Sequence, residues 1–138
     1  MASFTYNDAA SKLTALDASD IDWVNDTIKA RLVASSVTPN KDDTSMTGYT
    51  AIGTDQTVGT KSINKDTTND RIQYRAAAST WSAVAGGSTV GYVVYYRFIT
   101  DDAGSTPIFC VDIADTATNG GDLVYTPDAT NGVGYLQQ

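Results

Sequence analysis

The stretch Val90-Gly-Tyr-Val-Val-Tyr-Tyr-Arg-Phe-Ile99 says most about the fold of this chain. Side chains in a β-strand alternate between two faces, and here both faces are apolar. One face carries every second residue from Val90 to Phe98, and the other carries Val93, Tyr95 and Ile99. A strand of this kind is typical of the middle of a sheet that is covered on both sides. We therefore expect residues 90–99 to form a central, buried strand.

Two explanations are open for what covers the second face of this strand. The N-terminal helix or a loop of the same chain could cover it, which would make the face part of the core. Alternatively, Val93, Tyr95 and Ile99 could contact a second subunit, because tyrosine is enriched at interfaces and a bare apolar face would favour aggregation. The second explanation predicts a homo-oligomer.

Outward from this stretch, further strand-like runs follow one another with turn residues between them. The connections are too short for the crossover helices that parallel strands need. We therefore predict an all-β fold, an antiparallel β-sandwich or barrel of about 7–8 strands with one short N-terminal helix. The other expected strands are residues 27–35, 58–65, 71–77, 81–85, 108–113, 123–125 and 132–136.

The whole chain, residues 1–138, is predicted to be a single domain, with residues 1–25 forming an N-terminal arm and the short helix. The helix is expected within residues 4–17, where four apolar residues have helical spacing: Ala9, Ala10, Leu13 and Leu16. Phe4 and Tyr6 precede it without a strand neighbour of their own, so we expect them to become ordered on a partner. Trp23 is expected to pack where the helix meets the strand that contains Ile28.

Residues 38–57 are predicted to form a long surface loop. They contain Pro39, Gly48, Gly53 and the acidic pair Asp42 and Asp43, which is a composition typical of loops. Loops of this length are usually functional or mobile.

The composition indicates which partners are excluded. Charged residues make up 18% of the chain, all 16 acidic residues are aspartates, and 20 residues are threonines. The net charge of −7 argues against a nucleic-acid partner, because phosphate binding requires a basic surface. The apolar runs are far shorter than the roughly 20 residues of a membrane span, so no membrane partner is expected. We expect another protein as the partner.

The sequence also argues against catalysis and cofactors. It contains no histidine, which excludes Ser-His and Cys-His pairs and all His-containing metal sites. The aspartates lie mostly in turn-like segments, and no glutamate is present to close a calcium loop. Cys110 lies in an apolar run, where a buried and inert thiol is expected. We therefore predict that the protein is not an enzyme and has no cofactor or metal.

Residues 21–39, together with 41–43 and 48–50, carry a resemblance. They combine an acidic-aromatic turn, a "DTIK" strand, a "TP-x-x-D" loop and a "GY" turn after the predicted short helix. In this arrangement the chain resembles a family of small virion structural proteins from tailed bacteriophages. That family is similar to capsid decoration, or cement, proteins. The resemblance implies the major capsid protein or another virion protein as the partner, and it implies a location in the virion after synthesis in the host cytoplasm. It implies no catalytic residue and no cofactor.

Three functions follow from these observations. The first is a capsid decoration protein that binds and stabilises the assembled major capsid lattice. The second is a tail, connector or spike component of the virion. The third is a host-surface or glycan binding module, which would be favoured if Tyr49, Trp81 and Tyr135 were exposed.

Overall fold

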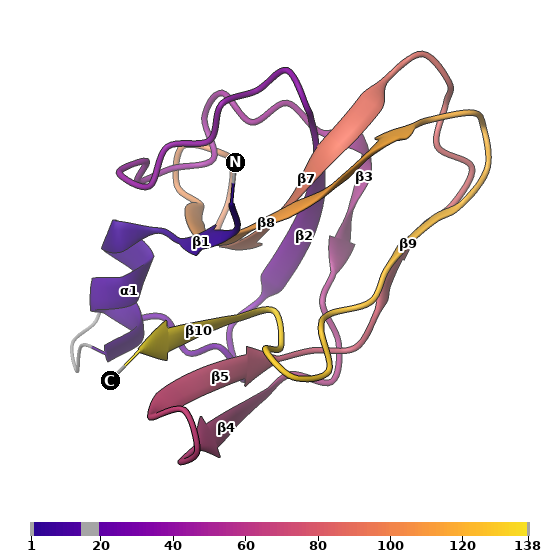
Figure 1. Cartoon of the computed structure of the whole chain (residues 1–138). Helices are drawn as coiled ribbons and strands as arrows, with labels where there is room; N and C mark the ends of the chain where they lie inside the picture. Colours follow the sequence, from indigo (N-terminus) through magenta and orange to yellow (C-terminus); the bar gives the residue numbers. More distant parts are fainter. Residues whose placement is uncertain (1, 15–19, 138) are drawn as a thin grey trace.

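The computed structural model of the chain describes residues 2–14 and 20–137. Within them lie one helix, α1 (Asn7–Thr14), and ten strands, all of whose ladders are antiparallel (Figure 1). The predicted all-β fold with a short helix is confirmed, and the sheets do not close into a barrel. The strands are β1 (Phe4–Thr5), β2 (Ile28–Ala34), β3 (Ile52–Thr57), β4 (Ser62–Asp66), β5 (Arg71–Arg75), β6 (Ser79–Trp81), β7 (Thr89–Arg97), β8 (Thr106–Ala117), β9 (Leu123–Tyr125) and β10 (Gly134–Gln137).

The main sheet has the strand order β1-β8-β7-β2-β3, with β7 in the middle. Val93 of β7 lies opposite Leu32 of β2 on one side and Val111 of β8 on the other. All residues of β7 except its first and last are buried. The expectation of a central strand covered on both sides is therefore confirmed, and it follows from the apolar residues on both faces.

A second layer consists of the three-stranded sheet β10-β5-β4 and the two-stranded sheet β6-β9. Trp23 connects the layers: its ring lies 5.8 Å from that of Tyr74 in β5 and 5.7 Å from that of Phe109 in β8. Its indole N–H donates to the Arg75 carbonyl oxygen at 3.1 Å. Gly134 of β10 passes so close that a Cβ there would collide with the Phe109 ring. Trp23 is thus a core residue between the two layers.

The prediction that residues 38–57 form a long surface loop is wrong in two respects. Its last six residues form β3, which pairs with β2 although its sequence, IGTDQT, is mostly polar. In addition, Met46 and Tyr49 are buried against the main sheet. Composition indicated a solvated loop because the apolar residues of this segment are few and widely spaced.

Other predicted boundaries move by a few residues. The strand expected at 58–65 begins later, at Ser62. Val58 directly follows β3, and its N–H donates to the Ile28 carbonyl oxygen of β2, so it belongs with the preceding strand. The described helix, Asn7–Thr14, lies within the expected segment 4–17, and its predicted member Leu16 lies outside the described residues. Among the residues that the structure describes, no helix has the length and apolarity that crossing a membrane requires.

Candidate interaction sites

The N-terminal segment does not form the free arm that the sequence suggested. Phe4 and Thr5 form β1, which pairs with Cys110 and Phe109 of β8. Tyr6 is completely buried, and its hydroxyl donates to the hydroxyl of Tyr49 at 2.9 Å. The prediction that this segment lacks a strand neighbour is therefore wrong. The reason is that β8 would otherwise have a bare edge at this point, which β1 covers.

The prediction that Val93, Tyr95 and Ile99 form a contact surface for a second subunit is wrong for two of these three residues. Val93 and Tyr95 have no exposed surface. Tyr95 packs against Trp23 and Tyr125, with ring centroids 6.3 Å away in both cases, so the same chain covers this face. Only Ile99, which lies beyond the end of β7, is exposed, at 53%. The first of the two explanations, an intramolecular core, therefore holds for Val93 and Tyr95.

A buried ion network lies on the opposite face of the main sheet. Arg31 of β2 forms ion pairs with Asp55 of β3 at 2.6 Å and with Asp102 at 2.9 Å, and it also donates to the Tyr49 carbonyl oxygen. The Tyr96 hydroxyl donates to Asp55 as well. Hydrogen bonding to Arg31 lowers the pKa of the Asp102 carboxyl. The network joins β2, β3, β7 and two loops.

This network has the properties of a structural element. Two carboxylates surround the single guanidinium, so the Arg31 cation is fully paired and the group carries a net charge of −1. Burial, together with a hydrogen bond to Asp43, raises the pKa of Tyr49 to about 12, so its hydroxyl stays neutral at pH 7. The sequence pattern suggested only that Arg31 alternates with apolar neighbours, and nothing in it connects Arg31 to Asp55 or Asp102. No signal in the sequence could have revealed the network.

The described residues contain no assembly of metal ligands, that is, no group of three or more Cys or Asp side chains placed to hold an ion. Cys110 is buried, and burial raises the pKa of its thiol to about 12. The thiol is therefore protonated at neutral pH and unreactive as a nucleophile.

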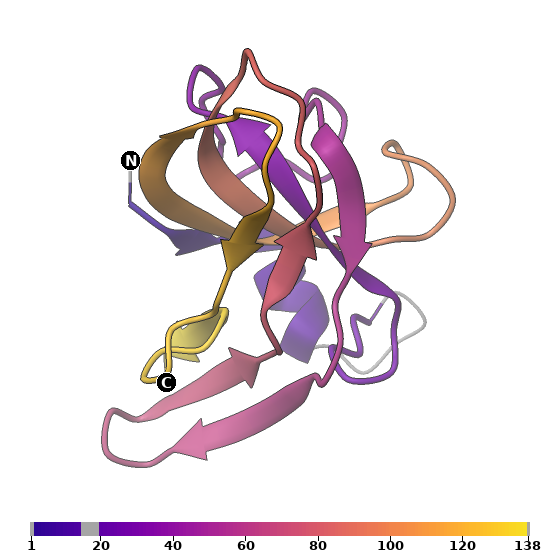
Figure 2. The same cartoon turned by 90° about the vertical axis from the view of Figure 1, so that its right-hand side faces the viewer.

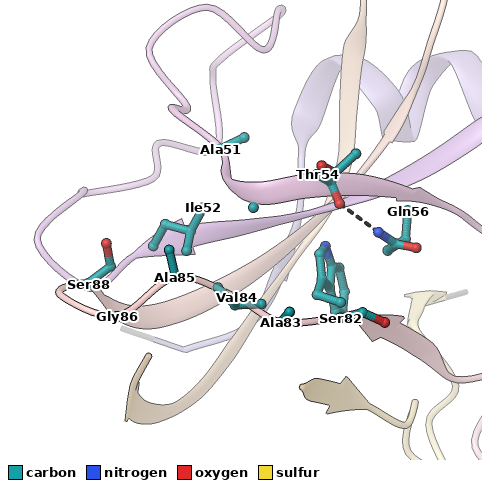
Figure 3. Close-up of a pocket in the computed structure, with 12 residues that line it drawn as sticks. Ala51, Ile52, Thr54, Gln56, Ser82, Ala83, Val84, Ala85, Gly86 and Ser88 are labelled. Atoms are coloured by element: carbon teal, nitrogen blue, oxygen red, sulfur yellow. Dashed lines mark hydrogen bonds between the residues drawn. The ribbon is translucent and has the colours of Figure 1, made fainter. Parts of the chain in front are cut away.

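A cleft of about 410 Å³ separates β3 from residues 82–88 (Figure 3). β3 and β6 lie next to each other but form no ladder. Figure 3 shows Ile52, Thr54 and Gln56 along one wall, and Ala85 of the other wall directed toward Ile52. Outside the cleft, the Ala77 N–H before β6 donates to the Gly59 carbonyl oxygen after β3 at 3.1 Å.

Trp81 contributes an unsatisfied donor to this cleft. Its side chain is 1% exposed, and its indole N–H has no acceptor among the residues that the structure describes. Its Cδ1 atom, which is bonded to Nε1, lies 3.9 Å from the position that a Cβ on Gly53 of β3 would take. The N–H edge of the ring therefore faces β3. Leaving a buried donor unpaired costs about 1–3 kcal/mol, so the site needs an explanation.

The β4–β5 hairpin extends away from the main sheet (Figure 2), and its exposed strand is β4, since three of the five residues of β5 are buried. The first four residues of β4 are exposed, among them Ile63 at 51%. Ile63 lies opposite Tyr74, which is buried, and Lys65 lies opposite Ile72, which is half-buried. This face therefore carries a short apolar strip made of Ile63 and the uncovered part of Ile72. A recess of about 630 Å³ runs beside Ile63 and Ile72.

The exposed aromatic platform required by a glycan-binding module is largely missing. Tyr49 and Trp81 are buried, at 3% and 1% exposure. Tyr135 is 42% exposed, but the Arg71 guanidinium lies 4.5 Å from the centre of its ring.

No protein-family model, curated protein or solved structure matches this chain. The sites above are therefore argued from their own geometry.

Proposed function

We propose that this protein is a virion structural protein of a tailed bacteriophage, and more specifically a capsid decoration protein that binds the assembled coat lattice through its β4–β5 hairpin. The observation that carries the proposal is the hairpin itself. β4 has one unpaired edge within the described part of the chain, and its side chains make little contact with the core. An exposed strand edge with an uncovered apolar strip is typical of a protein-binding element.

The charge distribution supports a contact through this hairpin. Residues 61–75 contain four basic and two acidic residues and carry a net charge of +2, whereas the rest of the chain contains five basic and fourteen acidic residues and carries −9. The hairpin is thus the basic end of an acidic protein. A partner surface that combines acidic and apolar groups fits it, and binding should weaken as salt screens the charges.

The assignment to a virion rests on the resemblance of residues 21–50, and the choice of the capsid is the finer part of the proposal. A tail, connector or spike component would use the same hairpin in the same way. The glycan-binding alternative has less support, because Tyr49 and Trp81 are buried.

The test uses mature coat shells and separately purified tails of the phage that carries the gene. We expect the protein to sediment with the shells and to saturate at a fixed number of copies per shell. Ile63→Asp should reduce the binding at least tenfold, because it places a carboxylate in the apolar strip. Val24→Asp is the matched control, since Val24 is also an exposed apolar residue, at 43%, but lies outside the hairpin.

Each outcome of this test has a defined meaning. Binding to tails alone would support the second function and reject the capsid assignment. Binding to neither particle would reject the virion proposal. Equal binding by Ile63→Asp and Val24→Asp would reject the hairpin as the contact element.

A further inference from the structure

The outer edge of β4 is regular and open. Its ladder with β5 has no register shift, and no residue from 62 to 66 has a positive φ. The edge strand β3, by comparison, has a shifted register with β2 and a positive φ at Gly53. No described segment of the chain lies beyond β4 on its outer side (Figure 1 and Figure 2). The edge of β4 therefore has both the regular backbone and the space that an added strand requires.

The backbone groups of Ile63 and Lys65 point out of this edge. The Tyr74 carbonyl oxygen of β5 accepts from the Val133 N–H at 2.8 Å, so Tyr74 directs its backbone groups toward the β10 side and away from β4. Ile63 lies opposite Tyr74. In an antiparallel ladder, the two residues of such a pair both direct their N–H and C=O away from each other. Ile63, and by the two-residue alternation Lys65, therefore offer two donors and two acceptors to a further strand.

The hairpin is held in place by its own contacts although it extends away from the main sheet. Asp66, at the end of β4, accepts hydrogen bonds from the backbone N–H groups of Thr68 and Asn69 in the turn. It also forms an ion pair with Arg71 of β5 at 2.9 Å. From β10, the Gln137 side-chain amide donates to the Asn69 carbonyl oxygen at 2.9 Å. Pairing with an edge that is already ordered costs less conformational entropy than ordering the edge during binding.

Lys65 selects the charge of the added strand. It is exposed and lies on the same face as Ile63, two residues away. Among the described residues Lys65 has no ion-pair partner, whereas Arg71 is paired with Asp66. A lysine on an edge strand hinders pairing with arbitrary strands and so protects against aggregation. A strand with a carboxylate opposite Lys65 overcomes this protection, because opposite charges attract each other across a ladder.

We infer that the partner adds an antiparallel strand to the outer edge of β4, with an acidic side chain opposite Lys65 and an apolar side chain opposite Ile63. Read from its N-terminus, this segment has the pattern acidic-x-apolar, because an antiparallel strand meets Lys65 before Ile63. Strand addition draws affinity from main-chain hydrogen bonds and specificity from alternate side chains. The inference rests on the proposed function only for the identity of the partner, the coat protein. A second copy of this chain fits less well, since two hairpins that each carry +2 repel each other.

The first experiment titrates the ¹⁵N-labelled full-length protein with short peptides and follows its backbone amides by NMR. The probe is the acetylated and amidated peptide Thr-Asp-Thr-Val-Thr, which has the length of β4. The control peptide, Thr-Lys-Thr-Val-Thr, differs only in the charge that it places opposite Lys65. Asn64 provides the control within the protein, because its N–H points toward Gln73 of β5 and is already bonded.

We expect the acidic peptide, at saturation, to slow the hydrogen exchange of the Ile63 and Lys65 amides at least fivefold and to leave that of Asn64 unchanged. The lysine peptide should bind at least threefold more weakly, because like charges opposite each other are unfavourable. If neither amide gains protection, or if both peptides protect them equally, the inference is wrong.

A proline at the edge provides the second test. The N–H of Lys65 points outward, so Lys65→Pro removes a donor from the edge without removing a ladder bond to β5. Lys65→Ala is the matched control, since it removes the same charge and keeps the donor. We expect Lys65→Pro to bind the acidic peptide and mature coat shells at least fivefold more weakly than Lys65→Ala, with little difference in melting temperature between the two variants.

The outcomes separate this inference from the proposed function. Equal binding of Lys65→Pro and Lys65→Ala to shells would refute strand addition and leave the hairpin as the contact element. Protection of the edge amides by the acidic peptide, without binding to any shell, would support the edge site and reject the coat protein as its partner. A wild-type dimer that Lys65→Pro converts to a monomer, measured by sedimentation equilibrium, would assign the edge to a second copy and overturn the inference.

Discussion

Strands β7 and β4 belong to antiparallel sheets of the same small domain, yet their surroundings are opposite. β7 has a neighbour on each side, and its two faces are covered by different parts of the chain. β4 has one neighbour, and its first four residues are exposed. The comparison shows that the two strands contribute differently to stability. Burial on both faces makes β7 costly to alter, whereas β4 can change its side chains with little effect on folding.

The strongest test of this comparison introduces the same charge into both strands. Tyr95→Asp places a carboxylate among buried rings, with no cation beside it, and should reduce the free energy of unfolding by more than about 4 kcal/mol. Ile63→Asp should change it by less than about 0.5 kcal/mol, because Ile63 is half exposed. Urea denaturation measures both effects. A Tyr95→Asp protein that stays folded but elutes as a smaller species would restore the subunit-interface explanation for this face.

The next test removes the contact between the two layers. Trp23→Ala deletes a side chain that is 1% exposed and that touches Tyr74, Tyr95 and Phe109. We expect a loss of about 3–5 kcal/mol of unfolding free energy, which is typical when a large aromatic core residue is truncated. The urea concentration at the midpoint of denaturation, compared between wild type and variant, measures this loss. An unchanged midpoint would mean that Trp23 is exposed in solution and that the layers are held by other contacts.

A third test concerns the ion network of Arg31, Asp55 and Asp102 on one face of the main sheet. Arg31→Met leaves Asp55 nearly buried without its cation and should cost about 3 kcal/mol at pH 7. Because Arg31 holds the pKa of Asp102 below its usual value of 3.8, this pair stabilises the fold above that value and loses its effect as the pH falls below it. The variant should therefore show less acid destabilisation between pH 5 and about pH 2 than the wild type. An equal loss of stability in acid for both proteins would contradict this role.

A fourth effect is expected only at high pH and is absent at neutral pH. Burial raises the pKa of Cys110 from its usual 9.0 to about 12, and burial together with Asp43 raises that of Tyr49 from 10.0 to about 12. The unfolded chain loses these protons first, so neither group changes the stability at neutral pH. Stability falls by about 1.4 kcal/mol per pH unit above about pH 9 for Cys110 and above about pH 10 for Tyr49. Cys110→Ala should move the onset toward pH 10 in urea titrations. An onset that stays at pH 9 would assign the effect to another group.

Some elements of the fold follow from the sequence alone. The apolar residues on both faces of 90–99 predict a covered central strand, and the turn residues between short runs predict antiparallel connections. These predictions succeed because local periodicity reports directly whether the two faces of a strand meet an apolar environment. Trp23 is also expected in the core from the sequence, since its size makes burial strongly favourable.

Other elements depend on distant segments. β1 and β3 are too short or too polar to be detected, and they exist because the bare edges of β8 and β2 accept their backbone groups. The lack of histidine and the scarcity of basic residues limit the chemistry that the side chains can perform, and both are properties of the sequence. The candidate sites, however, could not be predicted from residue patterns. The cleft at Trp81 and the strip at Ile63 exist because other segments of the chain do not cover these surfaces, and the sequence does not show which segments lie nearby.

The sequence by itself therefore determined the fold class, the central strand and the acidic character of this protein. Only the tertiary structure decided that Tyr6, Val93 and Tyr95 are core, that Arg31 is paired with Asp55 and Asp102, and that β4 has one unpaired edge among the described strands. The physical reason is that a residue pattern specifies what a side chain prefers as its surroundings. Which segment supplies those surroundings is decided by contacts between residues far apart in the chain.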